Sequence, residues 1–311
     1  MADLELIVEP RVVKTRAEFS ATAPAFSIAL DGYVYGATFF DPTGPRLNLN
    51  HHEEVDRLST LSTAGQVFNY LKAGLFEYFQ QGHRPMAKVH VNDPDQDTSL
   101  SCWELWNHER ITGYHSEPLI SRLVFAQDKL DIFAGAYPFA PASEIMKDVF
   151  WIFQPYAEQR GKIATMDASG MRAIMEAVGA RIDHYVIGKG EKLAVVVQDH
   201  FKMLRQGTGW SLVEETGPYA RTGLYHAGIQ AFVAYRGENK GSHQYSFGRF
   251  SPFVPFSLLK LYERLNQEEG ITTNNSDRWG GGNTAGGSPR ERGSVFAPDV
   301  LFEKVEKIMK G

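Results

Sequence analysis

Cysteine is almost absent from the chain: Cys102 is the one cysteine among 311 residues. A single cysteine excludes an intramolecular disulfide framework and any zinc site built from several cysteines. The sequence also lacks an apolar run of the roughly 18–20 residues that a membrane-spanning helix needs. The first residues, MADLELIVEP, lack the basic region and apolar stretch of a signal peptide. These absences predict a soluble cytoplasmic protein without a membrane partner.

An excess of positive charge is missing as well. The chain has 32 Lys and Arg against 37 Asp and Glu, a net charge of −5 and a pI near 6.1. This balance makes long nucleic acid an unfavourable partner and favours a small ligand. The GxSxG, HExxH and GK[ST] motifs are absent too, so serine-hydrolase, zincin and P-loop chemistry are not indicated. Cys102 lies in the apolar stretch SLSCWELW and is interpreted as a core residue.

The length and a composition of 43% apolar and 22% charged residues indicate about two folded domains. In the first half, predicted strands at 26–35, 47–50 and 86–91 alternate with predicted helices at 59–80 and 98–110. This alternation is typical of a parallel sheet. A mostly helical stretch at 118–185 follows, and from about 210 a β pair, a helix, a glycine-rich segment and a last helix. We predict an α/β fold: a parallel-sheet domain at 1–150, a helical connector at 151–212 and a smaller α+β domain at 213–311.

Three carboxylates lie within five residues, at Asp93, Asp95 and Asp97. Such crowding is costly unless the group is well solvated or a cation neutralises it. The loop follows a predicted strand and opens a predicted helix, which is where ligands bind in parallel sheets. An exposed turn in which Asp97 caps the helix is the alternative. An EF-hand is disfavoured, because Thr98 takes the place of its glycine and a strand precedes the loop.

Two adjacent histidines, His51 and His52, follow a short predicted strand in the segment NLNHHEEVDR. One can ligate a metal while the other faces the substrate, and Asp56 lies close by in the sequence. Surface or hydrogen-bonded histidines are the alternative interpretation.

Further carboxylates are candidates for the same site. Asp31 ends the predicted strand FSIALD, just before a glycine. Asp128 and Asp131 are three residues apart, so one helical face can present both. Asp131 taken alone is interpreted as a helix-surface residue.

A glycine-rich segment, RWGGGNTAGGSPR at 278–290, has five glycines between 280 and 287 and several neighbouring arginines. Glycine lets a ligand approach the backbone closely, and consecutive backbone amides beside arginine suit an anion. A flexible linker is the alternative. Arg249 ends a predicted strand, and we expect it to face the same anion.

Together these motifs resemble the DHH phosphoesterase superfamily, which includes RecJ-type exonucleases, nanoRNases and family II pyrophosphatases. GIQAFVAYRG, YSFGRFS, a helix and RWGGGNTAGG look like the DHH-associated C-terminal domain. There a strand-borne Arg and a GGGH loop hold the substrate. The matching residues are Arg249, Gly280, Gly281, Gly282 and Asn283, with Asn283 in place of the family's His.

The N-terminal half is similar to the metal-binding domain of the same superfamily, with three departures. NHH at 50–52 stands where the family has Asp-His-His. PDQD at 94–97 resembles the family's Pro-Asp-x-Asp, but the His expected before it falls on Val91. The Asp motif also follows the His motif instead of preceding it, so the arrangement looks circularly permuted. Strand ends meet in space whatever the chain order, so a permuted site can still form.

The resemblance implies a metal-dependent hydrolase of a small phosphoester, such as a short oligonucleotide or a cyclic nucleotide, in a cleft between the domains. Two Mn²⁺ or Mg²⁺ ions would be held by Asp31, His51, Asp93, Asp95, Asp97 and Asp128. The implied catalytic residues are His52, which would polarise the scissile phosphate, and Asp56. Arg249, the glycine loop and Arg290 would bind the substrate. Altered, non-phosphoesterase chemistry on the same scaffold and a metal-free nucleotide- or metabolite-binding protein remain the alternatives, and a homodimer stays open.

Overall fold

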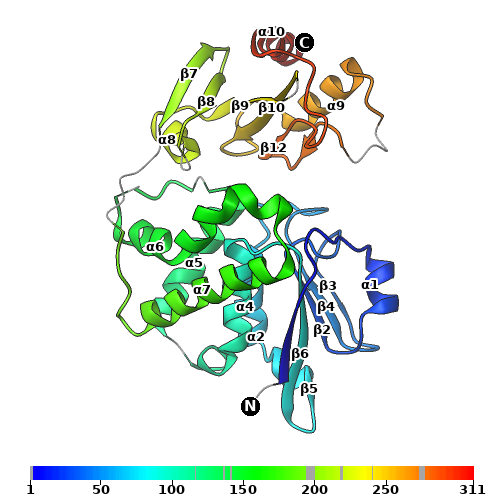
Figure 1. Ribbon diagram of the computed structural model, residues 1–311, viewed down its shortest axis with the longest axis vertical. Helices are drawn as coiled ribbons and strands as arrows, with labels where there is room; N and C mark the ends of the chain where they lie inside the picture. Colours follow the sequence, from blue (N-terminus) through cyan, green and yellow to red (C-terminus); the bar gives the residue numbers. More distant parts are fainter. Residues whose placement is uncertain are drawn as a thin grey trace. The chain divides into compact units, whose positions relative to one another are not determined.

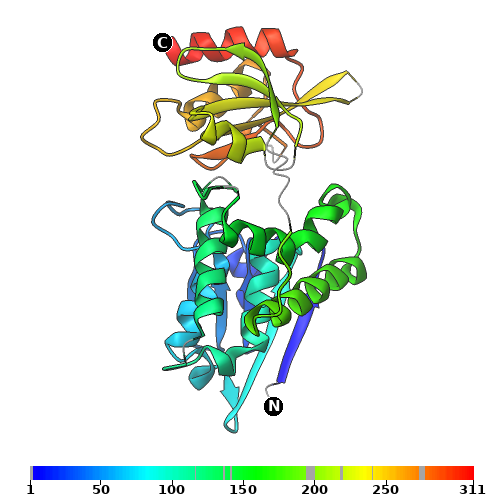
Figure 2. The same cartoon turned by 90° about the vertical axis from the view of Figure 1, so that its left-hand side faces the viewer.

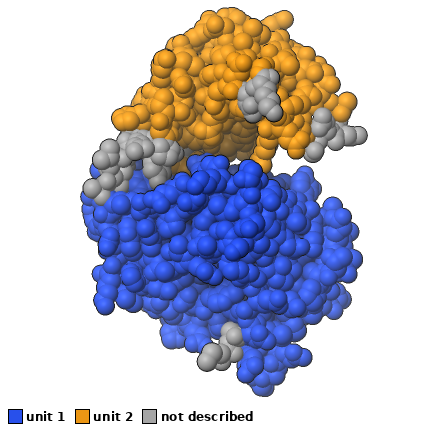
Figure 3. Space-filling model, viewed as in Figure 1, with its two compact units in different colours: residues 1–132, 139–195 blue, residues 133–138, 196–311 orange. Residues whose placement is uncertain are grey.

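The computed structural model describes residues 3–115, 117–135, 137–140, 142–193, 200–217, 220–239, 241–272 and 277–311. The chain folds into two compact units (Figure 3). Unit 1 comprises residues 1–132 and 139–195, and unit 2 comprises residues 133–138 and 196–311. Each unit contains one mixed β-sheet together with helices, so the predicted α/β class is confirmed at that level.

The sheet of unit 1 has the strand order β1-β6-β2-β4-β3. Its strands are β1 (Asp3–Val8), β2 (Ser27–Leu30), β3 (Phe39–Asp41), β4 (Arg46–Leu49), β5 (Gln80–Gln81) and β6 (Arg84–Val91). β1, β6, β2 and β4 run parallel, whereas β3 and β5 pair antiparallel with β4 and β6. The predicted parallel sheet is therefore present in four strands and ends in an antiparallel edge.

Helices cover both faces of this sheet (Figure 1). They are α1 (Arg16–Thr22), α2 (Thr63–Lys72), α3 (Leu75–Tyr78), α4 (Gln96–Trp106), α5 (Pro118–Ile132), α6 (Glu144–Gln159) and α7 (Ala168–Val186). α1 lies on one face, and α2, α4, α5 and α7 form the layer on the other. All four residues of β2, SIAL, are buried, as expected for a parallel strand covered on both sides.

α7 belongs to unit 1, although the sequence analysis placed it in a connector. Asp183 accepts a hydrogen bond from Trp103 Nε1 of α4 at 2.8 Å, and Arg172 donates to the Leu6 carbonyl of β1 at 2.9 Å. These contacts, with the buried apolar side of α7, anchor the helix to the sheet domain. The units accordingly divide at 132–139 and 195, not at the expected 150 and 212.

The sheet of unit 2 has the strand order β11-β12-β10-β9-β8-β7, and every pairing except β8 with β9 is antiparallel. Its elements are β7 (Phe201–Gln206), β8 (Ser211–Glu215), α8 (Ala220–His226), β9 (Ala231–Asn239), β10 (Ser242–Arg249), α9 (Leu258–Glu268), β11 (Gly280–Gly281), β12 (Ala285–Gly287) and α10 (Pro298–Lys310). α9 and α10 pack with Phe247 on one face, and α8 packs with Phe232 on the other (Figure 2).

Several short elements had no counterpart in the sequence analysis: β1, α1, β3, β7, β8 and α8. Among the residues that the structure describes, no helix has the length and apolar character that crossing a membrane requires.

Candidate metal centre

The carboxyl ends of three neighbouring parallel strands, β6, β2 and β4, meet at one edge of the unit 1 sheet. Asp31 directly follows β2, and His51 and His52 follow β4. Asp97 lies in the first turn of α4, after β6, and Asp131 lies in the last turn of α5. The convergence predicted for the strand ends is therefore present, at the edge where ligands bind in parallel sheets.

His51 is at the centre of this edge. Its Nε2 lies 2.7 Å from Asp131 Oδ2, 3.5 Å from Asp31 Oδ1 and 3.6 Å from Asp97 Oδ2. His52 Nε2 lies 2.8 Å from the same Asp31 oxygen. Two overlapping groups result, Asp31 with His51 and His52, and His51 with Asp97 and Asp131. Within each group one ligand atom per residue lies within 4.8 Å of the others.

The turn after β2 presents Asp31 to the histidines. Asp31 and Gly32 both have positive φ, +50° and +80°, so the chain reverses sharply at the strand end. Thr63 Oγ1 donates to Asp31 Oδ1 at 3.0 Å, and Thr98 Oγ1 donates to Asp31 Oδ2 at 3.3 Å. These bonds, from the first turns of α2 and α4, fix the orientation of the carboxylate.

Asp97 is fully buried and faces the amino end of α2, not solvent. Its two oxygens accept the backbone N–H of Thr63 at 2.6 Å and of Ala64 at 3.1 Å. Asp95 caps α4 instead, accepting the Thr98 N–H at 2.9 Å. The alternative of an exposed turn with Asp97 as the helix cap is therefore wrong.

Asn50 shapes the loop that carries both histidines. Its Oδ1 accepts the backbone N–H of His51 at 2.8 Å and of His52 at 3.1 Å. Its Nδ2 donates to the Gly36 carbonyl at 2.9 Å and to Glu53 Oε2 at 2.7 Å. An aspartate cannot make the second set of bonds, because a carboxylate has no N–H to donate. Asn50 thus has a structural role that an aspartate could not take over.

Burial and crowded charge shift the pKa of each group in the cluster. For Asp97, burial and the nearby Asp131 and Asp31 raise the pKa to about 7. Burial alone would lower the pKa of His51, but the charge of Asp131 raises it to about 11. Burial opposes ionisation of Asp31 too, yet His52 and His51 hold its pKa well below the usual range. The cluster thus needs positive charge, which protons on the histidines supply here.

The pKa values of the neighbouring Asp95 and Glu104 are raised, like that of Asp97. Burial and the charge of Asp31 raise the pKa of Asp95 well above its ordinary value. Burial and Asp97 do the same for Glu104, which lies two turns further along α4.

Asp131, not Asp128, supplies the carboxylate from α5. Asp128 accepts the Ser62 N–H at 2.8 Å and pairs with Lys129, so it supports the start of α2. Asp131 faces His51 and is held by Arg57 at 3.2 Å. From the sequence both residues are candidates, and Asp131 taken alone is expected on the helix surface. The i, i+3 spacing was the signal; which of the two faces the histidines depends on how α5 is rotated against the sheet.

Other predicted site residues lie outside the two groups. Asp56 is exposed and accepts the Leu58 N–H in a local turn, so its predicted catalytic role has no geometric support. Asp93 is half-buried in the loop before α4, and Asp95 serves as the cap of that helix. Neither belongs to the two ligand groups found among the described residues.

The glycine-rich segment of unit 2 forms an ordered hairpin, β11–β12, that extends the sheet beside β10. A Cβ on Gly286 would lie 2.0 Å from Tyr262 Oη, and one on Gly281 would lie 2.5 Å from the Gly286 Cα. These glycines are required by close packing. The flexible-linker alternative is wrong for the described part of this segment.

Arg249 is committed to the same part of unit 2. Its Nε donates to the Asn283 carbonyl, and its Nη1 lies 3.3 Å and 3.2 Å from the carbonyls of Pro252 and Val254. The side chain therefore fixes the hairpin loop to the segment after β10. Arg290 is exposed just beyond the hairpin. Anion binding by these residues stays a prediction.

Comparison of the chain with family models, with curated proteins and with solved structures finds no match. The geometry of the cluster is therefore the basis on which its function is argued.

Proposed function

We propose that the chain is a metal-dependent hydrolase of small phosphoesters whose centre is the cluster of Asp31, His51, His52, Asp97 and Asp131. The observation that carries this proposal is the convergence of three carboxylates and two imidazoles at the carboxyl edge of a parallel sheet. The resemblance of the flanking motifs to the DHH superfamily supports phosphoesters as the substrate class. The net charge of −5 favours a small substrate over a long polyanion.

The residues present fit a divalent cation. Carboxylate oxygens with imidazole nitrogens suit Mn²⁺, and carboxylates also suit Mg²⁺. His51 Nε2 lies within 3.6 Å of carboxylate oxygens of Asp131, Asp31 and Asp97, so a cation could replace the proton there. Three buried carboxylates around one imidazole are costly unless protons or a cation offset their charge. The two ligand groups share His51, whose Nε2 can ligate one ion, so the cluster supports a compact centre built around that nitrogen.

A bound cation would supply Lewis acidity toward a phosphoryl oxygen and would lower the pKa of an attacking water. Contact with the substrate and positioning of the reacting groups would come from side chains of the protein. His52 is the more accessible histidine, with 32% of its side chain exposed, while Asp31 orients its ring. His52 can therefore donate to a phosphoryl oxygen of the substrate. Asn50 fixes the backbone of His52, and Thr63 and Thr98 fix the carboxylate of Asp31. Little reorganisation of these groups is therefore needed when a substrate binds.

The decisive experiment measures the metal content of protein purified without chelators or metal-affinity resin. The wild type is compared with a His51→Ala/Asp97→Ala variant, and Asp56→Asn serves as the matched carboxylate control. We expect up to two equivalents of Mn or a similar ion in the wild type and the control, and none in the double variant.

Phosphate or nitrophenol release is then followed with bis-p-nitrophenyl phosphate, a cyclic nucleotide and a short oligonucleotide. Metal-dependent release that the double variant loses supports the hydrolase. A protein that binds Mn²⁺ but cleaves none of these substrates would favour altered chemistry on the same scaffold. Absence of metal even after Mn²⁺ is added would overturn the proposal.

A further inference from the structure

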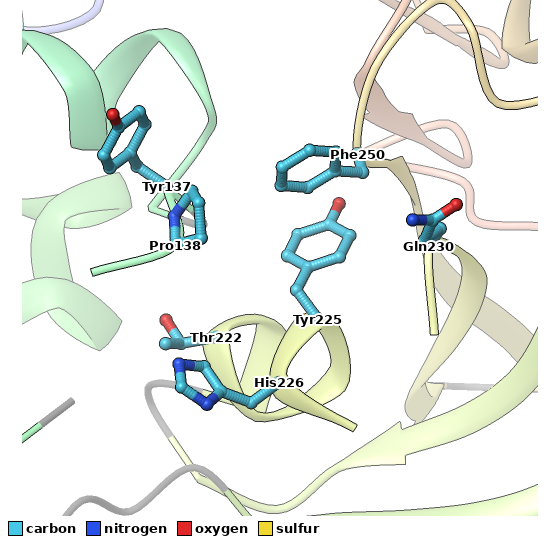
Figure 4. Close-up of a pocket in the computed structure, with 7 residues that line it drawn as sticks. All are labelled: Tyr137, Pro138, Thr222, Tyr225, His226, Gln230 and Phe250. Atoms are coloured by element: carbon cyan, nitrogen blue, oxygen red, sulfur yellow. The ribbon is translucent and has the colours of Figure 1, made fainter. Parts of the chain in front are cut away.

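Unit 2 contains a pocket that the metal centre does not use (Figure 4). Its volume is about 280 Å³. Thr222, Tyr225 and His226 reach it from α8, Gln230 from the residue before β9, and Phe250 from the end of β10. Tyr137 and Pro138, which belong to the same unit, lie across the hollow from Tyr225 and Phe250. The lining is thus mostly aromatic.

The aromatic walls are fixed by contacts within unit 2. Tyr225 and Phe250 pack edge to face, with ring centroids 5.3 Å apart and an interplanar angle of 69°. Phe133 contacts both Phe250 and Tyr137, at centroid distances of 5.5 Å and 5.3 Å. Such pairs hold rings in defined orientations. The flat surfaces around the hollow are therefore in place before any ligand binds.

A hydrogen bond also fixes the wall of the pocket that Tyr137 and Pro138 form. The Thr222 hydroxyl donates to the Gly135 carbonyl at 3.1 Å and so ties the segment of Tyr137 and Pro138 to α8. Burial raises the pKa of Tyr225 to about 12, so its phenol is neutral at physiological pH. Tyr225 and Phe250 therefore offer uncharged ring surfaces that are held in place, and the imidazole of His226 also lines the pocket.

Size and chemistry restrict the ligand. A volume of about 280 Å³ is close to the lower end of small-molecule pockets, roughly 300–1,000 Å³, and fits one planar ring system. Aromatic walls bind such a ring by stacking. At the rim, the exposed Gln230 presents an amide, which has both N–H donors and a carbonyl acceptor. This amide can form hydrogen bonds with a heteroaromatic ring whose edge carries donors and acceptors. A plain hydrocarbon ring has no such groups and would form no hydrogen bond with the amide.

We infer that this pocket is a binding site for a planar heteroaromatic ring of the nucleobase type, held by Tyr225 and Phe250 and read at its edge by Gln230. The site lies within unit 2 and needs no metal ion. It stands whether or not unit 1 hydrolyses phosphoesters.

The test uses the full chain and adenosine, a nucleoside without phosphate, titrated by calorimetry in the presence of EDTA. We expect saturable binding that EDTA leaves unchanged. Phe250→Leu keeps apolar bulk but removes the ring, and should weaken binding about tenfold, as loss of one stacked base does. Gln230→Ala should cause a smaller loss. Phe253→Ala is the matched control, because Phe253 is 91% exposed and does not line the pocket.

Thermal unfolding of each variant shows that weaker binding does not come from loss of the fold. Cytidine and N-acetyltryptophanamide are further probes: binding of adenosine or cytidine in preference to the indole supports the proposal. No saturable binding of either nucleoside would overturn it, as would full affinity in Phe250→Leu. Equal affinity for N-acetyltryptophanamide would replace it with a general apolar site. None of these outcomes depends on metal, so they are separate from failure of the proposed hydrolase.

Discussion

The acidic edge of unit 1 and the glycine hairpin of unit 2 both stand out in the sequence, but the structure uses them differently. At the edge, His51 is buried among three carboxylates, and its Nε2 lies 2.7 Å from Asp131 Oδ2. Beside the hairpin, Arg249 donates hydrogen bonds to backbone carbonyls. Within the hairpin, Gly286 leaves the space that the Tyr262 hydroxyl occupies. The first region gathers buried carboxylates whose charge is balanced only by bound protons or a cation, whereas the groups of the second region bond to and pack against one another.

This difference separates two kinds of unusual sequence. A buried cluster of carboxylates points to a cation, because uncompensated buried charge is costly. A glycine cluster is explained by packing where neighbouring atoms occupy the space that a side chain would need. The predictions below test this division, beginning with the largest expected effect.

Asn50→Asp is expected to be the most damaging change. It places a carboxylate against the carbonyls of Val34 and Gly36 and against Glu53, in a side chain that is fully buried. An unpaired buried charge costs about 3–5 kcal/mol. Chemical denaturation should show this loss in the free energy of unfolding. Asn69→Asp, the same change at an exposed position of α2, should have little effect. Equal stability of both variants would contradict the role of Asn50.

Asp131→Asn and Asp128→Asn form a second matched pair, because the two residues are one turn apart on α5. Asp131 lies 2.7 Å from His51, whereas Asp128 accepts the Ser62 N–H. We expect Asp131→Asn to weaken Mn²⁺ binding by about 10–100-fold and Asp128→Asn to leave the affinity nearly unchanged. Calorimetric titration of metal-free protein measures both. The reverse order would restore Asp128 as the ligand.

This pair also shows where sequence reasoning reached its limit. Alternating strands and helices predicted the parallel sheet, and the strand ends located Asp31, His51 and Asp97 correctly. The choice between Asp128 and Asp131 depends on the rotation of α5 about its axis, which residue spacing alone does not determine. Asp95 and Asp97 differ for a similar reason, since one caps its own helix and the other reaches the neighbouring helix α2.

The assignment of α7 to unit 1 depends on contacts that are distant in the sequence. α7 has an apolar face typical of any packed helix, and nothing in its periodicity says which domain it packs against. The contacts of Arg172 and Asp183 with β1 and α4 decide this, and they are separated from their partners by 166 and 80 residues. In β7 and β8, buried and exposed residues do not alternate regularly, so the pattern of a half-buried strand is missing.

Gly286→Ala tests the packing interpretation of the hairpin. Its Cβ would meet Tyr262 Oη at 2.0 Å, so the tyrosine or the hairpin must shift, at a cost of about 1–3 kcal/mol. Gly280→Ala is the control in the same hairpin, because its Cβ would have no neighbour closer than 4.0 Å. Thermal unfolding should separate the two variants, while Mn²⁺ affinity stays unchanged in both. If Gly286→Ala left the stability unchanged, packing would not explain the glycines, and a ligand-binding role would be favoured instead.

The acidic edge also predicts how stability depends on pH. The pKa of Asp97 is raised to about 7 by burial and by its acidic neighbours, so the folded protein binds a proton that the unfolded chain releases near pH 4. Metal-free protein should therefore lose roughly 4 kcal/mol of stability as the pH rises from about 4 to 7, because each unit of pKa difference contributes about 1.4 kcal/mol. Asp31 and Asp131 have lowered pKa values, and their contribution changes only below about pH 4.

A bound cation should reverse this trend, because it replaces the protons of the cluster. The stabilisation by Mn²⁺ should therefore grow with pH over the same range, as shown by denaturation with and without EDTA. A pH-independent effect of Mn²⁺ would place the ion outside the cluster.

Arg290→Ala is expected to have the smallest effect. Arg290 is exposed, and loss of such a residue usually changes stability by less than about 0.5 kcal/mol. If the hairpin region binds a phosphate of the substrate, the variant should raise KM for a phosphoester while kcat stays constant, since only uniform binding is lost. Arg264→Ala on α9 is the matched control, because Arg264 is an exposed arginine too. Equal KM values for both variants and the wild type would leave the hairpin with packing alone, and would sharpen its contrast with the acidic edge.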